Sequence, residues 1–341
     1  MGVATQIMWR LLALVLLAAS TEVQAEPVAD FYKGKTLRMV VGYSPGGGYD
    51  IYGRLAAEFL GRHIPGNPGI IVVNMPGIGS LKAIDYLYQI APQDGTYLGS
   101  VMQQMALTTV IDDKNKMNIA RFNYIGRLTS NIDIAVALPQ AKIRSFQEAR
   151  QREVLLGADQ SGSMSVVYAK ALNTFGGAKL KIIRGYSGSA EVQLAAERGE
   201  VEVNGSYSLP AVLASHPSWV TGRVVSILYQ NALKRFHQLE YVPTVLDLML
   251  SDEGRGVARV IAGAGEIGRS IITTPGVPPE RLAALRQAFQ EMIKDSDFVA
   301  ATAKRNSLID PAAGEEMDAI TRETISLPES TKSSLKNLLK D

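Results

Sequence analysis

Cysteine is absent from the 341 residues, and histidine occurs only three times. Without a thiol the chain can form no disulfide, carry no lipid on cysteine and use no cysteine as a nucleophile or metal ligand. Long runs of like charge are missing too, since 35 basic residues face 33 acidic ones for a net charge of +2. Nucleic-acid binding requires a concentrated basic face, so this balance argues against nucleic acid as a partner.

The scarcity of histidine also argues against most enzyme classes. His63 lies just past an expected helix, where a surface or capping role is favoured, and His216 and His237 have no carboxylate or second histidine at metal-binding spacing. No Gly-x-Ser-x-Gly nucleophile turn occurs. We therefore expect neither a metal nor another cofactor, and a periplasmic enzyme is kept only as an alternative that would need an unusual catalyst.

Apolar runs long enough to span a membrane are missing throughout the chain. Arg10 precedes the short apolar run "LLALVLLAAS", and "TEVQA" then supplies Val23 and Ala25 as small residues of a cleavage site. This pattern predicts a secretory signal peptide over residues 1–25, which leaves an exported chain that begins at Glu26. A chain without cysteine and without stable membrane insertion fits a bacterial periplasm.

Strand-like and helix-like segments alternate along the rest of the chain. "TLRMVVGY", "IIVVNM" and "TYLGSVM" indicate buried strands in the first third, and "EVLLGA", "LKII" and "VVSILY" indicate further strands later. Helical periodicity follows most of them, which predicts an α/β architecture with mostly parallel sheets. Residues 258–276, "ARVIAGAGEIGRSIITTPG", are predicted to be an extended and turn-rich return.

Three consecutive glycines follow the first strand and open the first helix, in "VGYSPGGGYD". A strand that ends in a glycine-rich turn before a helix presents unpaired N–H groups at the positive end of the helix dipole, which is an anion site. Asp50 can cap the helix. A phosphate-binding P-loop is excluded because Gly-Lys-Ser/Thr is missing. "GAGEIG" at residues 263–268 matches a dinucleotide fingerprint in letters, but no helix is predicted to open there.

A second candidate surface combines "SGSMS" with "GYSGSAE" in the middle of the chain. Both stretches follow predicted strands, which is where ligands meet α/β sheets. The serines supply hydroxyls and the glycines permit close backbone approach, although capping of the following helices is an alternative role for the serines. The candidate ligand-binding residues on this surface are Ser161, Gly162, Ser163, Gly188 and Ser189.

The ordered segments "PGGGYD", "NMPGIGS" and "APQDGT" resemble the exported substrate-binding proteins of tripartite tricarboxylate transporters, the TctC or Bug receptors. "GYSGSAEV", "RGEVEV", "VPTVLDL" and "TTPGVPPERLAAL" extend the resemblance over the whole mature chain. It implies a two-lobed, flytrap-like α/β fold of the type II periplasmic-binding-protein kind with a ligand cleft between the lobes. One lobe would comprise residues 26–126 and about 250–341, and the other about 127–249.

The resemblance also implies a function and a set of site residues. Receptors of this family bind small carboxylates and related solutes, and deliver them to the membrane subunits of the transporter. A sensor protein of the same fold, which presents its ligand to another partner, is the alternative that the sequence leaves open. By motif match the ligand-binding residues in the two lobes are Tyr43, Ser44, Gly46, Gly47, Gly48, Tyr49 and Asp50, and Tyr186, Gly188 and Ser189.

Some positions depart from the family pattern. Met102, Gln103, Gln104 and Met105 replace a small-residue stretch, Tyr49 is bulkier than the frequent threonine, and "VNGSYSLP" differs from an Asp-containing segment. The pocket wall has therefore changed, and Gln103 is included among the candidate ligand-binding residues. Three arginines next to predicted strands or turns could clamp a second carboxylate, although solvated surface pairs are the favoured expectation for each: Arg127, Arg184 and Arg269.

Overall fold

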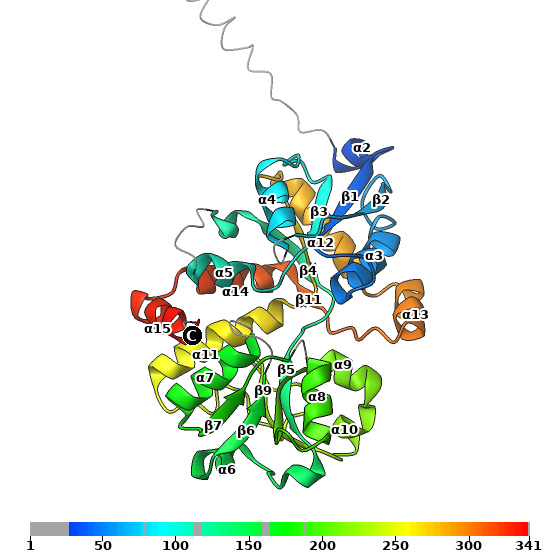
Figure 1. The fold of residues 1–341 in the computed structure, drawn as a ribbon. Helices are drawn as coiled ribbons and strands as arrows, with labels where there is room; N and C mark the ends of the chain where they lie inside the picture. Colours follow the sequence, from blue (N-terminus) through cyan, green and yellow to red (C-terminus); the bar gives the residue numbers. More distant parts are fainter. Residues whose placement is uncertain (1–26, 78–79, 112–116, 159–163, 187–188, 340–341) are drawn as a thin grey trace, which may run out of the picture.

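Two sheets, one in each of two lobes, organise the chain (Figure 1). The computed structural model describes residues 27–77, 80–111, 117–158, 164–186 and 189–339. In spatial order, the first-lobe sheet contains β11 (Ala312–Ala313), β4 (Asn123–Arg127), β10 (Ser270–Thr273), β3 (Tyr97–Ser100), β1 (Thr36–Val41) and β2 (Gly69–Asn74). The second-lobe sheet contains β7 (Leu180–Ile183), β6 (Val154–Gly157), β8 (Val203–Ser208), β5 (Asp133–Ala137) and β9 (Ser226–Asn231).

Both sheets are mixed, so the prediction of mostly parallel sheets is wrong. β1 pairs in parallel with β2 and β3, but β10 runs antiparallel to β3 and β4. In the second lobe β6 pairs in parallel with β7 and β8, whereas β5 runs antiparallel to β8 and β9. β5 and β10 are the strands by which the chain enters each lobe from the other. Each of them begins at the end of its sheet where the neighbouring parallel strands finish, and it therefore runs antiparallel to those strands.

Helices cover both faces of the sheets. The helices that precede or follow the strands of the first sheet in the sequence are α2 (Val28–Tyr32), α3 (Gly48–Leu60), α4 (Leu81–Gln89), α5 (Met105–Ile111), α12 (Pro279–Met292), α13 (Ser296–Lys304) and α14 (Gly314–Ile325), with a 3-10 turn η2 (Ile119–Arg121). Those of the middle of the chain are η3 (Pro139–Ala141), α6 (Phe146–Gln151), α7 (Met164–Gly176), α8 (Ser189–Glu197), α9 (Leu209–Ser215) and α10 (Pro217–Thr221). α11 (Asp252–Ile267) and α15 (Glu329–Leu339) complete the set.

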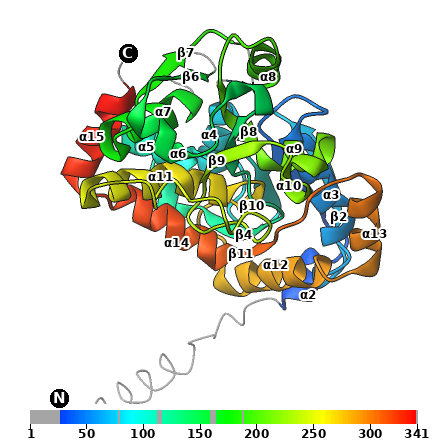
Figure 2. The same cartoon turned by 90° about the horizontal axis from the view of Figure 1, so that it is seen from below.

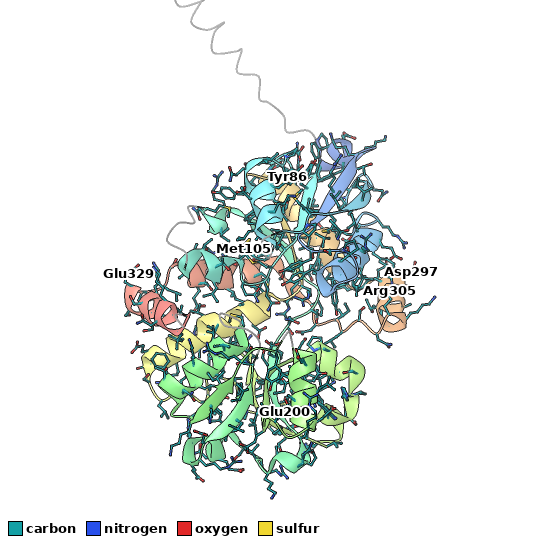
Figure 3. The ribbon with its side chains drawn as sticks, viewed as in Figure 1. Tyr86, Met105, Glu200, Asp297, Arg305 and Glu329 are labelled. Carbon is teal, nitrogen blue, oxygen red and sulfur yellow. The ribbon has the colours of Figure 1, made fainter. Side chains whose placement is uncertain are left out.

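Each sheet has its own hydrophobic core, and the C-terminal helices are divided between the two cores. Leu285 of α12 and Phe298 of α13 lie in one buried cluster with residues of β1 and α3. Val257 of α11 and Leu335 of α15 instead lie in a cluster with residues of β6 and α7. Figure 2 shows α11 between α7 and α14, and contacts join α11 to both helices. Met105, where α5 begins, is buried above α11 (Figure 3). The last helices therefore contact both lobes.

Helix α11 overturns the prediction of an extended, turn-rich return up to residue 267. Its N-terminus is capped by Ser251, whose hydroxyl accepts a hydrogen bond from the Gly254 N–H at 3.1 Å. The glycines that suggested turns instead permit close packing, since a Cβ at Gly254 would lie 2.5 Å from the Cβ of Phe175. Only the strand that follows, β10, is extended as expected. Within the described residues, no helix combines the length and the apolar character that a bilayer crossing requires.

Candidate functional site

The glycine loop connects the end of β1 to α3, as the sequence predicted. Gly46 has φ +90°, a left-handed conformation that side chains disfavour, whereas Gly47 is the N-cap of α3 with an ordinary extended backbone at φ −81°. A Cβ at Gly47 would meet its nearest atom only at 4.0 Å. The three glycines are exposed. The first N–H groups of α3, which have no partner inside the helix, are therefore reachable by a small ligand.

Asp50 holds this loop from inside the lobe. Its Oδ2 accepts hydrogen bonds from the Arg54 side chain at 2.9 Å and from the Gly46 N–H at 2.8 Å, and its Oδ1 accepts one from the Asn74 amide at 2.7 Å. The same Asn74 amide donates to the carbonyl oxygen of Tyr43 at 2.9 Å. The hydrogen bond from Arg54, with those from Gly46 and Asn74, lowers the pKa of Asp50 to about 2 despite its burial. Asp50 therefore positions the loop.

Two tyrosines and an arginine form one wall beside the loop. The rings of Tyr43 and Tyr49 stack at 4.4 Å between centroids, and the guanidinium of Arg269 lies 4.0 Å over the Tyr49 ring. Arg269 Nη1 donates to Gln103 Oε1 at 3.0 Å, and the Gln103 N–H donates to the Tyr49 hydroxyl at 2.9 Å. A Cβ at Gly48 would lie 3.3 Å from Arg269 Nε. Residues 43–50, Gln103 and Arg269 are thus brought together.

Arg269 also links this wall to the second lobe. Its Nη2 donates to Asn131 Oδ1 at 3.4 Å, and the Ser208 hydroxyl donates to the same oxygen at 3.2 Å. Asn131 lies in the segment between β4 and β5 that joins the lobes. The glycine loop is therefore close to the segment where the two sheets meet. The sequence patterns do not identify Asn74 or Asn131 as site residues, because the roles of both depend on contacts between distant segments.

The second-lobe candidates are only partly placed by the structure. Ser161, Gly162, Ser163 and Gly188 lie outside the described residues. Ser189 is the first residue of α8, and Tyr186 is half-buried against the apolar cluster around β5 and α8. Burial raises the pKa of Tyr186.

Polar groups gather where β5, β8 and β9 meet at the interlobe edge. The Ser206 hydroxyl donates to Asp133 Oδ2 at 2.7 Å. Asp133 is paired across the sheet with Asn231, whose fully buried amide finds no hydrogen-bond partner within the described residues. Polar side chains of the second lobe therefore lie near the start of β5, two residues after Asn131.

Arg127 is not available to a ligand. It is only 7% exposed, and its guanidinium donates to the carboxylates of Glu266 and Asp310, each at 3.0 Å. The expectation of a solvated surface pair is therefore wrong for Arg127, because the crossing of the lobes covers it. Arg184 follows β7 in the second lobe.

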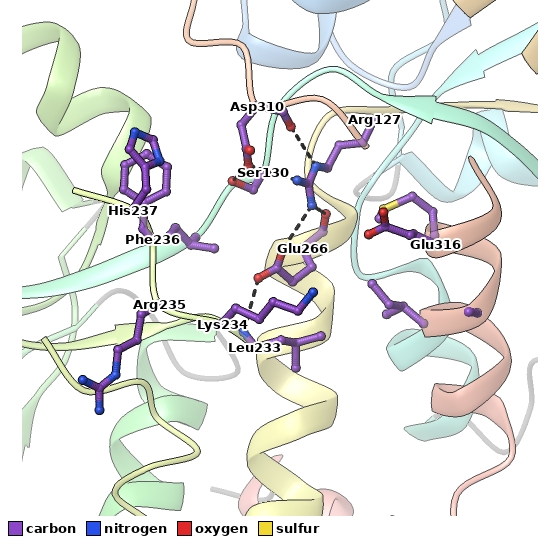
Figure 4. A pocket seen from close by; sticks show the side chains of 14 residues that line it. Arg127, Ser130, Leu233, Lys234, Arg235, Phe236, His237, Glu266, Asp310 and Glu316 are labelled. Carbon is purple, nitrogen blue, oxygen red and sulfur yellow. Dashed lines mark hydrogen bonds and ion pairs between the residues drawn. The ribbon is translucent and has the colours of Figure 1, made fainter. Parts of the chain in front are cut away.

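The Arg127 network borders a cavity of about 430 Å³ between the lobes (Figure 4). Glu266, near the end of α11, also accepts a hydrogen bond from the Leu233 N–H at 3.3 Å, and the Ser130 hydroxyl donates to Asp310 at 2.7 Å. The Glu266 carboxylate thus contacts both Arg127 of the first-lobe strand β4 and the second-lobe loop that contains Leu233. We interpret this network as one that stabilises the connection between the lobes, because its polar groups form hydrogen bonds and ion pairs with one another.

The remaining candidates for chemistry are accounted for by packing. His63 contacts Asp295, the N-cap of α13, at 3.0 Å, and His216 stacks on Trp219 at 4.3 Å. Among the described residues, no three His, Asp or Glu side chains are grouped to hold a metal ion. "GAGEIG" lies at the end of α11, not at the start of a helix. It therefore lacks the helix N-terminus that a dinucleotide pyrophosphate requires.

Comparison with solved structures identifies the fold. A TctC solute-binding protein from Polaromonas is 23% identical with a TM-score of 0.66, over 90% of this chain and 98% of that one. MatC from Rhodopseudomonas palustris with bound malate is 18% identical with a TM-score of 0.57, over 90% and 99%. An adipate-bound protein of R. palustris is also 18% identical with a TM-score of 0.57, over 90% and 97%.

These likenesses confirm the predicted two-lobed α/β fold of periplasmic solute-binding proteins. The Polaromonas neighbour is a solute-binding protein, and the two R. palustris neighbours hold adipate and malate. No protein-family model matches the chain, and no curated protein matches it.

Proposed function

We propose that this chain is an extracytoplasmic solute-binding receptor of the TctC or Bug family. It captures a small organic carboxylate between its lobes and delivers it to the membrane subunits of a tripartite tricarboxylate-type transporter. Residues 1–25 serve as a cleaved signal peptide that directs the protein to the periplasm. One lobe comprises residues 26–126 with about 250–341 and the other about 127–249, and α11 and α15 contact both.

The glycine loop is the observation that carries this proposal. Gly46 to Gly48 leave the N-terminus of a 13-residue helix uncovered, and Asp50 and Asn74 fix the loop from behind. Backbone N–H groups at a helix N-terminus bind a carboxylate without any reorganisation of side chains. Neighbours of this fold hold malate and adipate, which are small carboxylates. The second-lobe residues Ser161, Gly162, Ser163, Tyr186, Gly188 and Ser189 are proposed to close over the ligand from the other side.

A thermal-shift panel of mono-, di- and tricarboxylates, aromatic acids and amino acids tests the proposal. A ligand that binds only the folded state stabilises it by about 2.7 kcal/mol at a hundred times its dissociation constant. At least one acid should therefore raise the melting temperature clearly. A panel in which no acid does so would contradict the carboxylate receptor.

Two alternatives are separated by simple observations. A periplasmic enzyme would consume the stabilising acid during long incubation with purified protein, whereas a receptor returns it unchanged. A ligand-presenting sensor would bind the acid equally well but would lack neighbouring genes for two membrane subunits. The receptor is favoured because His63, His216 and Arg127 are engaged in packing and ion pairs.

A further inference from the structure

We propose that Lys234 and Glu316 form an ion pair across the interlobe cavity on the hinge side of the molecule, and that this pair favours the open form of the ligand cleft. The two residues thereby set how tightly the receptor holds its ligand, although neither of them touches it. The inference rests on the proposed function, because it concerns the closure of the lobes over a ligand at the glycine loop.

The cavity of about 430 Å³ lies across the hinge from the glycine loop. In the first-lobe sheet, β3 and β10 separate β1, which ends at that loop, from β4, whose last residue Arg127 lines the cavity. Strands are about 4.8 Å apart, so the ends of β1 and β4 are roughly 14 Å from each other. The chain passes between the lobes at residues 128–132 and 268–269, and the latter lead into β10, between these two points.

The two walls of the cavity belong to different lobes. The first-lobe wall is α14, which is fixed to β4 because the Tyr124 N–H donates a hydrogen bond to Asp318 Oδ1 at 3.0 Å. The second-lobe wall is the loop of residues 233–237 that follows β9. Its Phe236 N–H donates to the side-chain oxygen of the buried Gln230 at 2.8 Å. Each wall therefore moves with its own lobe.

One unpaired charge stands on each wall. Figure 4 shows that Lys234 and Glu316 point toward one another across the cavity, and neither has a hydrogen-bond or ion-pair partner among the described residues. The residue next to each is already paired within its own lobe. Arg235 binds Asp247 at 2.9 Å, and Glu315 binds an arginine of α12 at 3.0 Å.

The other carboxylates at the cavity are occupied. Glu266 and Asp310 both bind Arg127, each at 3.0 Å. Of the acidic side chains that line the cavity, this leaves Glu316 for the ammonium group of Lys234. Both side chains are exposed and long, so a modest approach of the walls brings their charges into contact.

The direction of the effect follows from the position of the hinge. The segments that cross between the lobes are held together by two backbone hydrogen bonds, from the Leu128 N–H to the Arg269 carbonyl at 3.0 Å and from the Arg269 N–H to the Thr129 carbonyl at 2.9 Å. A rotation about these segments that closes the cleft on one side separates the cavity walls on the other. The pair of Lys234 and Glu316 therefore forms as the cleft opens.

An interaction that is present only in the open form reduces ligand affinity. It lowers the fraction of ligand-free protein whose lobes are closed, and the apparent dissociation constant is the intrinsic one divided by that fraction. Exposed ion pairs are weak, so the effect on affinity amounts to a few fold. Salt screens the pair, so the effect should be largest at low ionic strength.

Charge reversal tests the pair without altering the ligand site. The proteins are the wild type, Lys234→Glu, Glu316→Lys, the double variant Lys234→Glu/Glu316→Lys and the control Glu280→Lys. Glu280 is exposed in the first turn of α12, as Glu316 is in the first turn of α14, so the control makes the same change in a first-lobe helix away from the cavity. Calorimetry uses the acid of the thermal-shift panel that stabilises the wild type most, at about 0.01 M and about 1 M salt.

Each single reversal places like charges on the two walls and should raise the affinity for this acid about 3- to 10-fold at low salt. The double variant restores opposite charges and should return to within about twofold of the wild type, as should Glu280→Lys. At about 1 M salt the gains should disappear. The single reversals change the net charge in opposite directions, so a simple attraction of the anionic acid would change their affinities in opposite directions.

The distance between the lobes gives a second readout that needs no ligand. Because the chain contains no cysteine, the exposed positions Ile51→Cys and Leu194→Cys introduce two specific sites for spin labels. They lie on α3 and α8, the helices that follow the candidate ligand loops of the two lobes. Pulsed distance measurements on ligand-free protein should give shorter distances in each single reversal than in the wild type, and wild-type distances in the double variant.

The outcomes separate this inference from the function on which it rests. Unchanged distances in both single reversals would overturn the inference, whether or not an acid binds. A double variant whose affinity or distance equals the sum of the two single effects would overturn it as well, because the charges would then act independently. If the distances respond as expected and no acid binds the wild type, the ion pair controls the lobes and the receptor function fails.

Discussion

The side-chain amide of Asn74 donates a hydrogen bond of 2.7 Å to the carboxylate of Asp50, and the two residues come from different elements. Asn74 is the last residue of β2, and Asp50 lies in the first turn of α3. The same amide also binds the carbonyl oxygen of Tyr43. The pair therefore joins strand, loop and helix into one unit, and the shape of the glycine loop depends on the ionised state of Asp50.

Asp50→Asn is expected to destabilise the loop and weaken ligand binding. The asparagine NH₂ group would face at least one N–H donor, from Gly46, Arg54 or Asn74, that now donates a hydrogen bond to the carboxylate. We expect a loss of about 1–3 kcal/mol in the free energy of unfolding, the usual cost of a lost hydrogen bond to a buried charge. Denaturant unfolding measures it, with the exposed Asp85→Asn as a control that should change little. Equal stability of the two variants would show that the loop does not need the charge.

The same carboxylate predicts a dependence of stability on pH. Asp50 has a pKa of about 2 in the folded protein, lowered from 3.8 by the hydrogen bond from Arg54 and those from Gly46 and Asn74. A lowered pKa contributes stability that is fully present above the unfolded value and is lost as pH falls through the folded value. The difference in unfolding free energy between wild type and Asp50→Asn should thus be constant above about pH 5 and shrink toward pH 2. A difference that grows on acidification would contradict this account.

Local patterns in the sequence were sufficient to predict the unit from β1 to α3. A continuous apolar run marks the buried strand β1, and the glycines before a periodic apolar stripe mark the turn and helix. What they could not reveal is which partners hold the loop. Asn74 and Arg269 are far from Gly48 in sequence, and only the pairing of β1 with β2, and of β3 with β10, brings them to it.

The region around α11 shows where the same reasoning fails. Gly254 and Gly265 resemble turn signals, because glycine weakens a helix in solution. In the folded chain they permit close packing against Phe175 and against the backbone of Asn131. Tertiary contact thus outweighs local propensity, and no pattern within the helix itself records those neighbours.

Glu266→Gln is expected to loosen the connection between the lobes. Glu266 accepts from Arg127 at 3.0 Å and from the Leu233 N–H at 3.3 Å, and glutamine would weaken the bond to the buried Arg127. Because Asp310 remains as a partner of Arg127, we expect a loss of only about 1–2 kcal/mol in unfolding free energy. Glu58→Gln, which breaks the exposed pair with Arg305, should cost less than about 0.5 kcal/mol. Equal costs for the two would show that the Arg127 network does not brace the fold.

Gly47→Asp is the sharpest test of the ligand site. Gly47 has φ −81°, which any residue adopts, and a Cβ there has open space around it, so the variant should fold. Its carboxylate would occupy the place of the ligand's anion and compete for the same N–H groups, and an aspartate at the N-cap even favours the helix. Two like charges about 4 Å apart repel by roughly 4 kcal/mol at an effective dielectric of 20, which corresponds to a loss of nearly a thousandfold in affinity.

Gly69→Asp provides the matched control for this variant. Gly69 begins β2, has no positive φ and has nothing within 4 Å of a Cβ, so the same substitution adds the same charge where the strand begins, away from the loop. Calorimetric titration with the acid that gives the largest thermal shift should show near-wild-type affinity for Gly69→Asp and no measurable binding for Gly47→Asp. Circular dichroism and melting curves should be alike for the two. A folded Gly47→Asp protein that still binds the acid would mean that the glycines serve only the turn, and that the ligand is held elsewhere.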